Sequence, residues 1–227
     1  EFEMRSQGKT YQEIAEAGGG IRNSVRKLRE ISESELADLV ETRLNLMLKH
    51  GTTTAECKSG YGLSTEAELK SLRAIKTASK RTPLQTFSTL LGAHEVPDEY
   101  RDDRETYIDL VINEMIPTVS QQKLAEYCDV FCEEGVYTTE ETEKILLAAR
   151  EHGMQLKFHA DEFVSSGGAE LAANMGALSA DHLMAISNTG ISALAKSDTV
   201  ATLLPGTTFF LGSNTWAPAR KLIDAGV

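Results

Sequence analysis

Three short apolar segments of this sequence each end in a histidine. The histidines are His94, His159 and His182, and Glu162 follows the second of them at the start of a loop. If the segments are parallel β-strands closed into a barrel, their carboxyl ends lie at one rim, where barrel enzymes carry their active sites. We therefore expect these four side chains to face one cavity. Imidazole and carboxylate groups gathered in this way are typical of a metal-assisted hydrolase.

His159 is the leading candidate for a metal ligand. A neutral imidazole suits Zn²⁺ or Fe²⁺, and alternation along a strand would place Asp161 on the same face as His159. Glu162 can serve as a general base. His182 can bind the metal, hydrogen-bond a substrate or shuttle a proton. Two structural alternatives stay open: His159 hydrogen-bonded inside a barrel core, and His182 packed against Asp181.

Glycine-containing segments supply further candidates. Lys58–Gly62 follows an apolar strand and exposes Tyr61, whose phenol suits either substrate contact or simple packing. Pro205–Thr208 follows another strand and could line a site for an anion or a substrate carboxylate. Gly18–Gly20 is interpreted as a hinge, a lid or an ordinary turn.

The composition is that of an acidic globular protein. The 227 residues are 41% hydrophobic and 25% charged, with a formal net charge of -11. This charge argues against nucleic acid and anionic membranes as partners, and no apolar run approaches the roughly 20 residues that span a bilayer.

Cys57, Cys128 and Cys132 do not form a disulfide framework, because the last two lie too far apart along a strand. We expect free thiols and a cytoplasmic protein.

From Gly51 onward, short β-branched or apolar segments alternate with longer segments of helical periodicity. About six βα units predict a parallel sheet covered by helices. A doubly wound sheet is the alternative, but no Gly-x-Gly-x-x-Gly follows the first strand. The predicted strands are 52–57, 84–91, 130–132, 156–160, 178–180 and 200–204. The predicted helices are 32–50, one opening after Ser64, 107–115 with a stop near Pro117, 139–152, 168–175, 189–196 and 218–225.

These elements predict an α/β fold of the (β/α)8 TIM barrel type. Six units are too few for a closed barrel, so we predict an incomplete barrel whose first and last strands are missing. Residues 1–227 then form one partial barrel domain with no internal boundary. Because the chain does not begin with Met and stops where a helix would pass to a strand, we expect a segment of a longer protein.

Eight short strings, in order along essentially the whole chain, resemble the imidazolonepropionase family of the amidohydrolase superfamily, whose members act in histidine degradation. The strings are Glu1–Arg5, Gly18–Ile21, Gly51–Glu56, Lys58–Leu63, Gly92–His94, His159–Glu162, Ser179–His182 and Leu203–Thr208.

The resemblance implies a metal-dependent barrel enzyme that opens the ring of 4-imidazolone-5-propanoate with water, giving N-formimidoyl-L-glutamate. It implies one divalent metal ion, Zn or Fe, bound by His159. Glu162 matches a substrate-contacting carboxylate that serves as base, and His182 matches a histidine that assists proton transfer or polarises the carbonyl. Tyr61 and His94 match substrate-binding positions. The implied partner is a small molecule, and a homodimer is left open.

Parts of the family pattern do not occur in this sequence. A first-strand His-x-His pair with a following arginine, a last-strand aspartate with its Asn-Pro-Gly loop, and a flanking β-sandwich would fall before Glu1 and after Val227. We expect the 227 residues alone to bind metal weakly and to be inactive. Two alternatives remain: another cyclic amidohydrolase or a deaminase, and a non-catalytic barrel remnant that binds a small molecule or a subunit.

Overall fold

The computed structural model describes residues 4, 7–8 and 21–227. The interpretation of Gly18–Gly20 as a hinge, lid or turn falls outside these residues. The elements are, in order, α3 (Ile21–Glu30), α4 (Glu33–Lys49), β1 (Thr54–Lys58), α5 (Thr65–Ser79), β2 (Gln85–Ala93), η1 (Asp98–Tyr100), α6 (Arg104–Leu110), η2 (Val111–Met115), α7 (Ile116–Gln121), β3 (Tyr127–Cys132), α8 (Thr139–Glu151), β4 (Gln155–Ala160), α9 (Gly168–Asn174), β5 (Ser179–His182), α10 (Asn188–Leu194), β6 (Val200–Thr202), α11 (Pro205–Leu211) and α12 (Ala219–Ala225).

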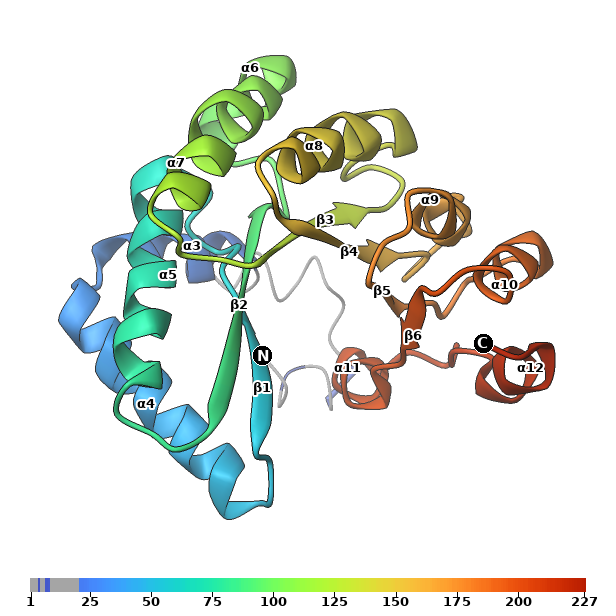
Figure 1. Ribbon diagram of the computed structural model, residues 1–227, viewed down its shortest axis with the longest axis horizontal. Helices are drawn as coiled ribbons and strands as arrows, with labels where there is room; N and C mark the ends of the chain where they lie inside the picture. Colours follow the sequence, from blue (N-terminus) through green and yellow to red (C-terminus); the bar gives the residue numbers. More distant parts are fainter. Residues whose placement is uncertain (1–3, 5–6, 9–20) are drawn as a thin grey trace. The chain divides into compact units, whose positions relative to one another are not determined.

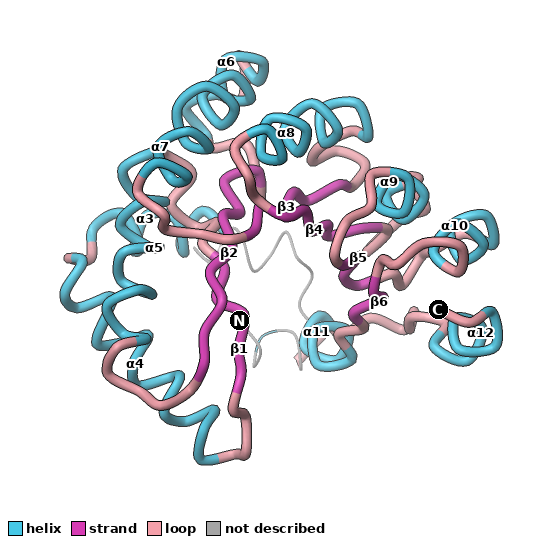
Figure 2. Tube along the Cα trace, in the orientation of Figure 1, coloured by secondary structure: helices cyan, strands magenta, loops and turns pink. Residues whose placement is uncertain are grey.

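The strands form one sheet in the order β1-β2-β3-β4-β5-β6. The pairs β1–β2, β4–β5 and β5–β6 are parallel, and helices alternate with strands along the chain (Figures 1 and 2). A doubly wound sheet reverses its strand order at a switch point, whereas consecutive strands of a barrel are always neighbours. The observed order therefore supports the barrel-type prediction over the doubly wound alternative.

The chain divides into two compact units. One unit comprises 25–129 with 145–155, and the other comprises the described residues before 25 with 130–144 and 156–227. We call them the β1–β2 unit and the β4–β6 unit after the strands that each contains. The predicted single partial barrel domain without a flanking β-sandwich stays a prediction.

In the β1–β2 unit, helices cover the paired strands β1 and β2. The register runs from Thr54 opposite Gln85 to Lys58 opposite Thr89. Helix α5 packs against β2, and α4 packs against α5 (Figure 1). The helices begin where the sequence predicts: Ser32 and Glu35 form a capping box for α4, and the Ser64 hydroxyl caps α5.

The predicted stop near Pro117 is wrong. Helix α6 passes through the π-helical segment η2 into α7, which continues to Gln121 and has Pro117 in its first turn. Proline lacks an N–H and its ring crowds the carbonyl of the preceding turn. A π-helical turn widens the backbone at that point, so the chain accommodates the proline without ending the helix.

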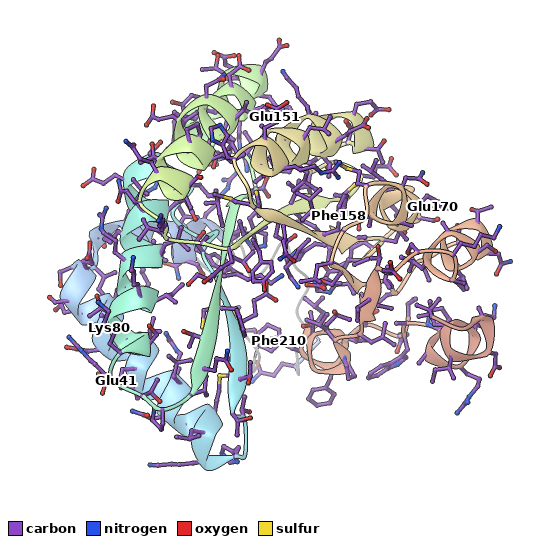
Figure 3. The ribbon with its side chains drawn as sticks, in the orientation of Figure 1. Glu41, Lys80, Glu151, Phe158, Glu170 and Phe210 are labelled. Carbon is purple, nitrogen blue, oxygen red and sulfur yellow. The ribbon has the colours of Figure 1, made fainter. Side chains whose placement is uncertain are left out.

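The β4–β6 unit has a core of small and aromatic side chains. Phe158 on β4 and Ala160, Ala169 and Ala180 are fully buried; Figure 3 labels Phe158 on β4 and Glu170 on α9. Helix α9 packs against β5 and α10. The close approach depends on Gly168, because a Cβ there would lie only 3.1 Å from the Cβ of Ala160.

One further difference from the sequence-based prediction is informative. Pro205–Thr208, expected as a loop around an anion or carboxylate, is the first turn of helix α11. Proline is favoured in a first helical turn, where its missing N–H would have no partner.

The thiols of Cys57, Cys128 and Cys132 are free, as expected. Among the described residues, no helix is long and apolar enough to cross a bilayer.

We predict that Gly168→Ala destabilises the fold by about 1–3 kcal/mol, because the added methyl group overpacks the contact with Ala160. Urea denaturation followed by circular dichroism measures the change. Gly206→Ala on α11 is the control, since a Cβ there meets no atom within 4 Å, and alanine favours the helix by up to about 1 kcal/mol. Equal stability of the Gly168→Ala variant and the wild type would contradict this packing.

Candidate active site

The ends of β4 and β5 bring two histidines together. In the parallel register, His159 lies opposite Asp181 and Ala160 opposite His182. The rings of His159 and His182 have centroids 5.0 Å apart, and the ring of Phe131 lies 5.6 Å from that of His159. Adjacent parallel strands that end at the same level therefore place both imidazoles at one edge of this unit.

Glu162 joins these histidines. Its Oε1 lies 3.4 Å from Nδ1 of His182, and the side chains of both residues are only 7% exposed. Burial raises the pKa of Glu162 to about 7, with the electrostatic interaction with His159 acting to lower the pKa and that with Glu133 acting to raise it. A carboxyl group that titrates near neutral pH suits a general base.

Unusual backbone conformations accompany the cluster. Asp161, His182 and Leu183 have φ values of 49°, 76° and 59°, in the left-handed region that non-glycine residues rarely adopt. Backbone hydrogen bonds hold them there: the Leu183 N–H donates to the Ala160 carbonyl (3.1 Å), and the Ala185 N–H donates to the Asp161 carbonyl (2.8 Å). Strain of this kind is common at functional sites.

Asp161 has a structural role that corrects the expectation that it shares a face with His159. Strand β4 ends at Ala160, so the alternation that supported the expectation stops before Asp161. Its buried carboxylate accepts hydrogen bonds from the N–H groups of Ser166, Gly168 and Ala169 at 2.9, 3.3 and 3.1 Å. Asp161 therefore closes the loop before α9.

Glu133, which follows β3, was not identified from the sequence. Its carboxylate accepts hydrogen bonds from the N–H groups of Glu162, Phe163 and Val164. The available signal was an acidic residue directly after a predicted strand. A bond to the backbone of a distant loop leaves no pattern in the sequence, so its partners were not predictable.

The donors His159 and Asp181 fit a divalent cation. Each offers one ligand atom, and these atoms lie within 4.8 Å of one another. Asp181 is also held in place, since its Oδ1 accepts a hydrogen bond from Ser179 (2.8 Å), whose hydroxyl accepts one from Lys157 (2.7 Å). Zinc takes three or four protein ligands, so a metal ion bound by these two residues needs others as well.

In the β1–β2 unit, Tyr61 and His94 form a pair. Their rings meet edge to face with centroids 5.0 Å apart. Nδ1 of His94 lies 2.9 Å from the carbonyl oxygen of Gly60, so Nδ1 carries the proton and donates. Tyr61 is 42% exposed, as its predicted loop position requires. It stays a prediction that Tyr61 and His94 act together with His159, Glu162 and His182.

Glu68 holds the loop that carries Tyr61. This fully buried carboxylate accepts hydrogen bonds of 2.8 Å from each of the N–H groups of Gly60, Gly62 and Leu63. Burial raises the pKa of Glu68, and its hydrogen bonds to Ser59 and to this backbone act to lower it. The conformation of the loop therefore depends on one side chain of α5.

Comparison with solved structures defines the class of fold. The atrazine chlorohydrolase of Arthrobacter aurescens, solved with zinc, superposes with a TM-score of 0.70 over 96% of this chain and 53% of its own, at 14% identity. The adenine deaminase of the same species gives a TM-score of 0.68 over 98% of this chain and 73% of its own, at 14% identity. The fold therefore matches part of the barrels of these two enzymes, which confirms the predicted incomplete (β/α)8 barrel.

Curated relatives narrow the class. The chain is 52% identical over 227 residues to the imidazolonepropionase of Treponema denticola, and 51% identical over 226 residues to that of Clostridium tetani. It spans about half the length of the curated relatives it matches. No family model matches the chain. The resemblance to the imidazolonepropionase family is confirmed along the whole chain. The comparisons give no better support to the alternatives, which are another cyclic amidohydrolase or a deaminase and a non-catalytic barrel remnant.

We predict that Glu162→Gln stabilises the metal-free chain at alkaline pH. The folded pKa of about 7 exceeds the unfolded value of about 4.3. The folded state therefore binds more protons between these values, and wild-type stability falls as pH rises through them. Urea titrations in EDTA should show the variant more stable by about 1–3 kcal/mol at pH 8, with no difference near pH 4.

Glu170→Gln is the matched control in the same unit, with the opposite sign. Burial acts to raise the pKa of Glu170, but hydrogen bonds from Thr189 and Ser187 lower it overall. Its ionised form therefore stabilises the fold above the unfolded pKa, so the Gln variant should lose stability at neutral pH and approach the wild type in acid. A Glu162→Gln variant no more stable than the wild type at pH 8 would contradict a buried, neutral-pH carboxyl group.

We predict that Glu68→Ala destabilises the β1–β2 unit by about 3 kcal/mol, because three buried N–H groups lose their acceptor. Equilibrium denaturation in urea measures the change. Glu66→Ala, at an exposed position on the same helix, should change stability by less than about 0.5 kcal/mol. Similar values for the two variants would show that the loop does not depend on Glu68.

Proposed function

We propose that the protein carrying this chain hydrolyses 4-imidazolone-5-propanoate to N-formimidoyl-L-glutamate in histidine degradation. The observation that carries the proposal is the cluster of His159, Glu162 and His182 in a chain about 50% identical along its whole length to imidazolonepropionases. A cyclic amide is a poor electrophile and water is a poor nucleophile, so the site must activate both.

Glu162 and His182 take the proton-handling roles in this proposal. Glu162 removes a proton from the attacking water as its oxygen bonds to the ring carbonyl carbon. The same carboxyl group then delivers that proton to the ring nitrogen as the carbon–nitrogen bond breaks. The carboxylic acid that results releases the second proton of the water to the solvent and becomes the carboxylate of the product. His182 donates to the carbonyl oxygen and stabilises its developing negative charge. The 3.4 Å separation of Glu162 and His182 allows both to reach one substrate carbonyl.

His159 is the proposed ligand of one divalent ion, Zn²⁺ or Fe²⁺, with Asp181 as a neighbouring donor. Such an ion, when bound, supplies Lewis-acid polarisation and a water that ionises near neutral pH. Zinc in the chlorohydrolase of similar fold is consistent with this choice.

The remaining assignments follow the family resemblance. Tyr61 and His94 are proposed to contact the small-molecule substrate, and Tyr61 is exposed enough to do so. We place the protein in the cytoplasm, because three free thiols suit a reducing compartment. A homodimer is the proposed assembly, which light scattering of the natural-length protein would check.

The test is turnover of 4-imidazolone-5-propanoate by the protein at its natural length, with the product identified by mass spectrometry. Glu162→Gln should lower kcat by about 10²–10⁴-fold, the usual contribution of a general base. Glu170→Gln, on helix α9 of the same unit, should retain kcat. Failure of the wild type to hydrolyse this substrate would contradict the proposed activity, and unchanged kcat in Glu162→Gln would contradict its role.

A further inference from the structure

We propose that Glu133 is a positioning residue for the reaction proposed above: its buried carboxylate fixes the backbone of 162–164 and so holds the Glu162 side chain against His182. The inference rests on the proposed function, in which Glu162 is the base. Glu133 itself is not assigned any contact with substrate or metal.

The hydrogen bonds are specific and short. Oε2 of Glu133 accepts from the N–H of Glu162 (2.8 Å) and of Phe163 (3.1 Å), and Oε1 accepts from the N–H of Val164 (2.9 Å). Glu133 is 2% exposed. Three successive N–H groups that converge on one carboxylate form an anion-binding nest, and a carboxylate is the side chain with enough acceptor sites to satisfy them.

Side-chain packing alone would not fix this loop. Phe163 is 58% exposed and Val164 is 40% exposed, and the ring of Phe163 lies 6.4 Å from that of Phe131. The Asp161 carboxylate holds the far end of the loop, where it accepts hydrogen bonds from the N–H groups of Ser166, Gly168 and Ala169. Between these points, the N–H groups of Glu162, Phe163 and Val164 donate to the Glu133 carboxylate.

Glu133 is itself firmly placed. Its N–H donates to the Tyr137 carbonyl (3.1 Å) and its carbonyl accepts from the N–H of Val136 (3.0 Å). Tyr137 is fully buried. The Glu133 carboxylate therefore connects a rigid turn after β3 to the loop after β4. A displacement of Glu162 would require the hydrogen bonds between this carboxylate and the N–H groups of 162–164 to break.

The proposal makes a graded prediction for two substitutions. Glu133→Ala removes all three acceptors. Glu133→Gln keeps one oxygen for two of the N–H groups and turns an NH₂ group toward the third. Because an error of about 1 Å in the position of a catalytic group can cost about 10²-fold in rate, kcat should fall by about 10²-fold in Glu133→Ala and by less in Glu133→Gln. KM should change by less than about threefold, since the base acts in the transition state.

Hydrogen exchange supplies a readout that needs no turnover. In the protein at its natural length, a peptide spanning 160–166 should exchange faster in Glu133→Ala than in the wild type, with Glu133→Gln between them. The control is Glu170→Gln, whose carboxylate accepts hydrogen bonds from Ser187 and Thr189 elsewhere in the unit. It should leave both the exchange of this peptide and kcat unchanged.

Faster exchange together with a kcat-specific loss supports the positioning role. Faster exchange with unchanged kcat overturns it, as does unchanged exchange in either variant. If Glu133→Ala fails to fold, Glu133→Gln decides the question by the same criteria. A wild type that does not hydrolyse the substrate would reject the proposed function and the positioning role with it, while the exchange data would still show separately whether Glu133 holds the loop.

Discussion

Buried carboxylates that accept backbone N–H groups hold the strand-end loops of this protein. Glu133, Asp161 and Glu68 each take three such N–H groups. Strand-end loops in parallel αβ folds have few apolar contacts of their own, and unpaired buried N–H groups are costly. One carboxylate satisfies several of them at once, so it fixes a loop conformation that the local sequence does not specify.

This arrangement explains how the chemistry of Glu162 is set. The loop that carries Glu162 begins at Asp161, whose backbone is left-handed. The Glu133 carboxylate accepts hydrogen bonds from the next three N–H groups. The Glu162 carboxyl group then lies buried beside His182. Burial then raises the pKa of Glu162 to about 7. The same desolvation that destabilises the ionised carboxylate makes it a better proton acceptor near neutral pH, so local stability is given up where the proposed reaction needs a base.

Much of this fold and site is predictable from sequence, and the exceptions have two causes. Strand-end histidines 159 and 182 and the following Glu162 lie together because equivalent ends of parallel strands meet, a rule that needs only the βα pattern. The roles of Asp161 and Glu133 were not predictable, because their partners are backbone groups. The predictions for Pro117 and Pro205 are wrong because proline can either end a helix or occupy its first turn. The surrounding backbone decides which of the two occurs.

The central claim is that Glu162 is a buried carboxyl group, held by its loop, which accepts a proton near neutral pH. Carbon-13 NMR of glutamate-labelled, metal-free protein measures this directly, with Glu162→Gln used to assign the resonance. The account predicts a titration midpoint near the value of about 7 set by burial. A midpoint near 4.3, the value of a solvated glutamate, would contradict it.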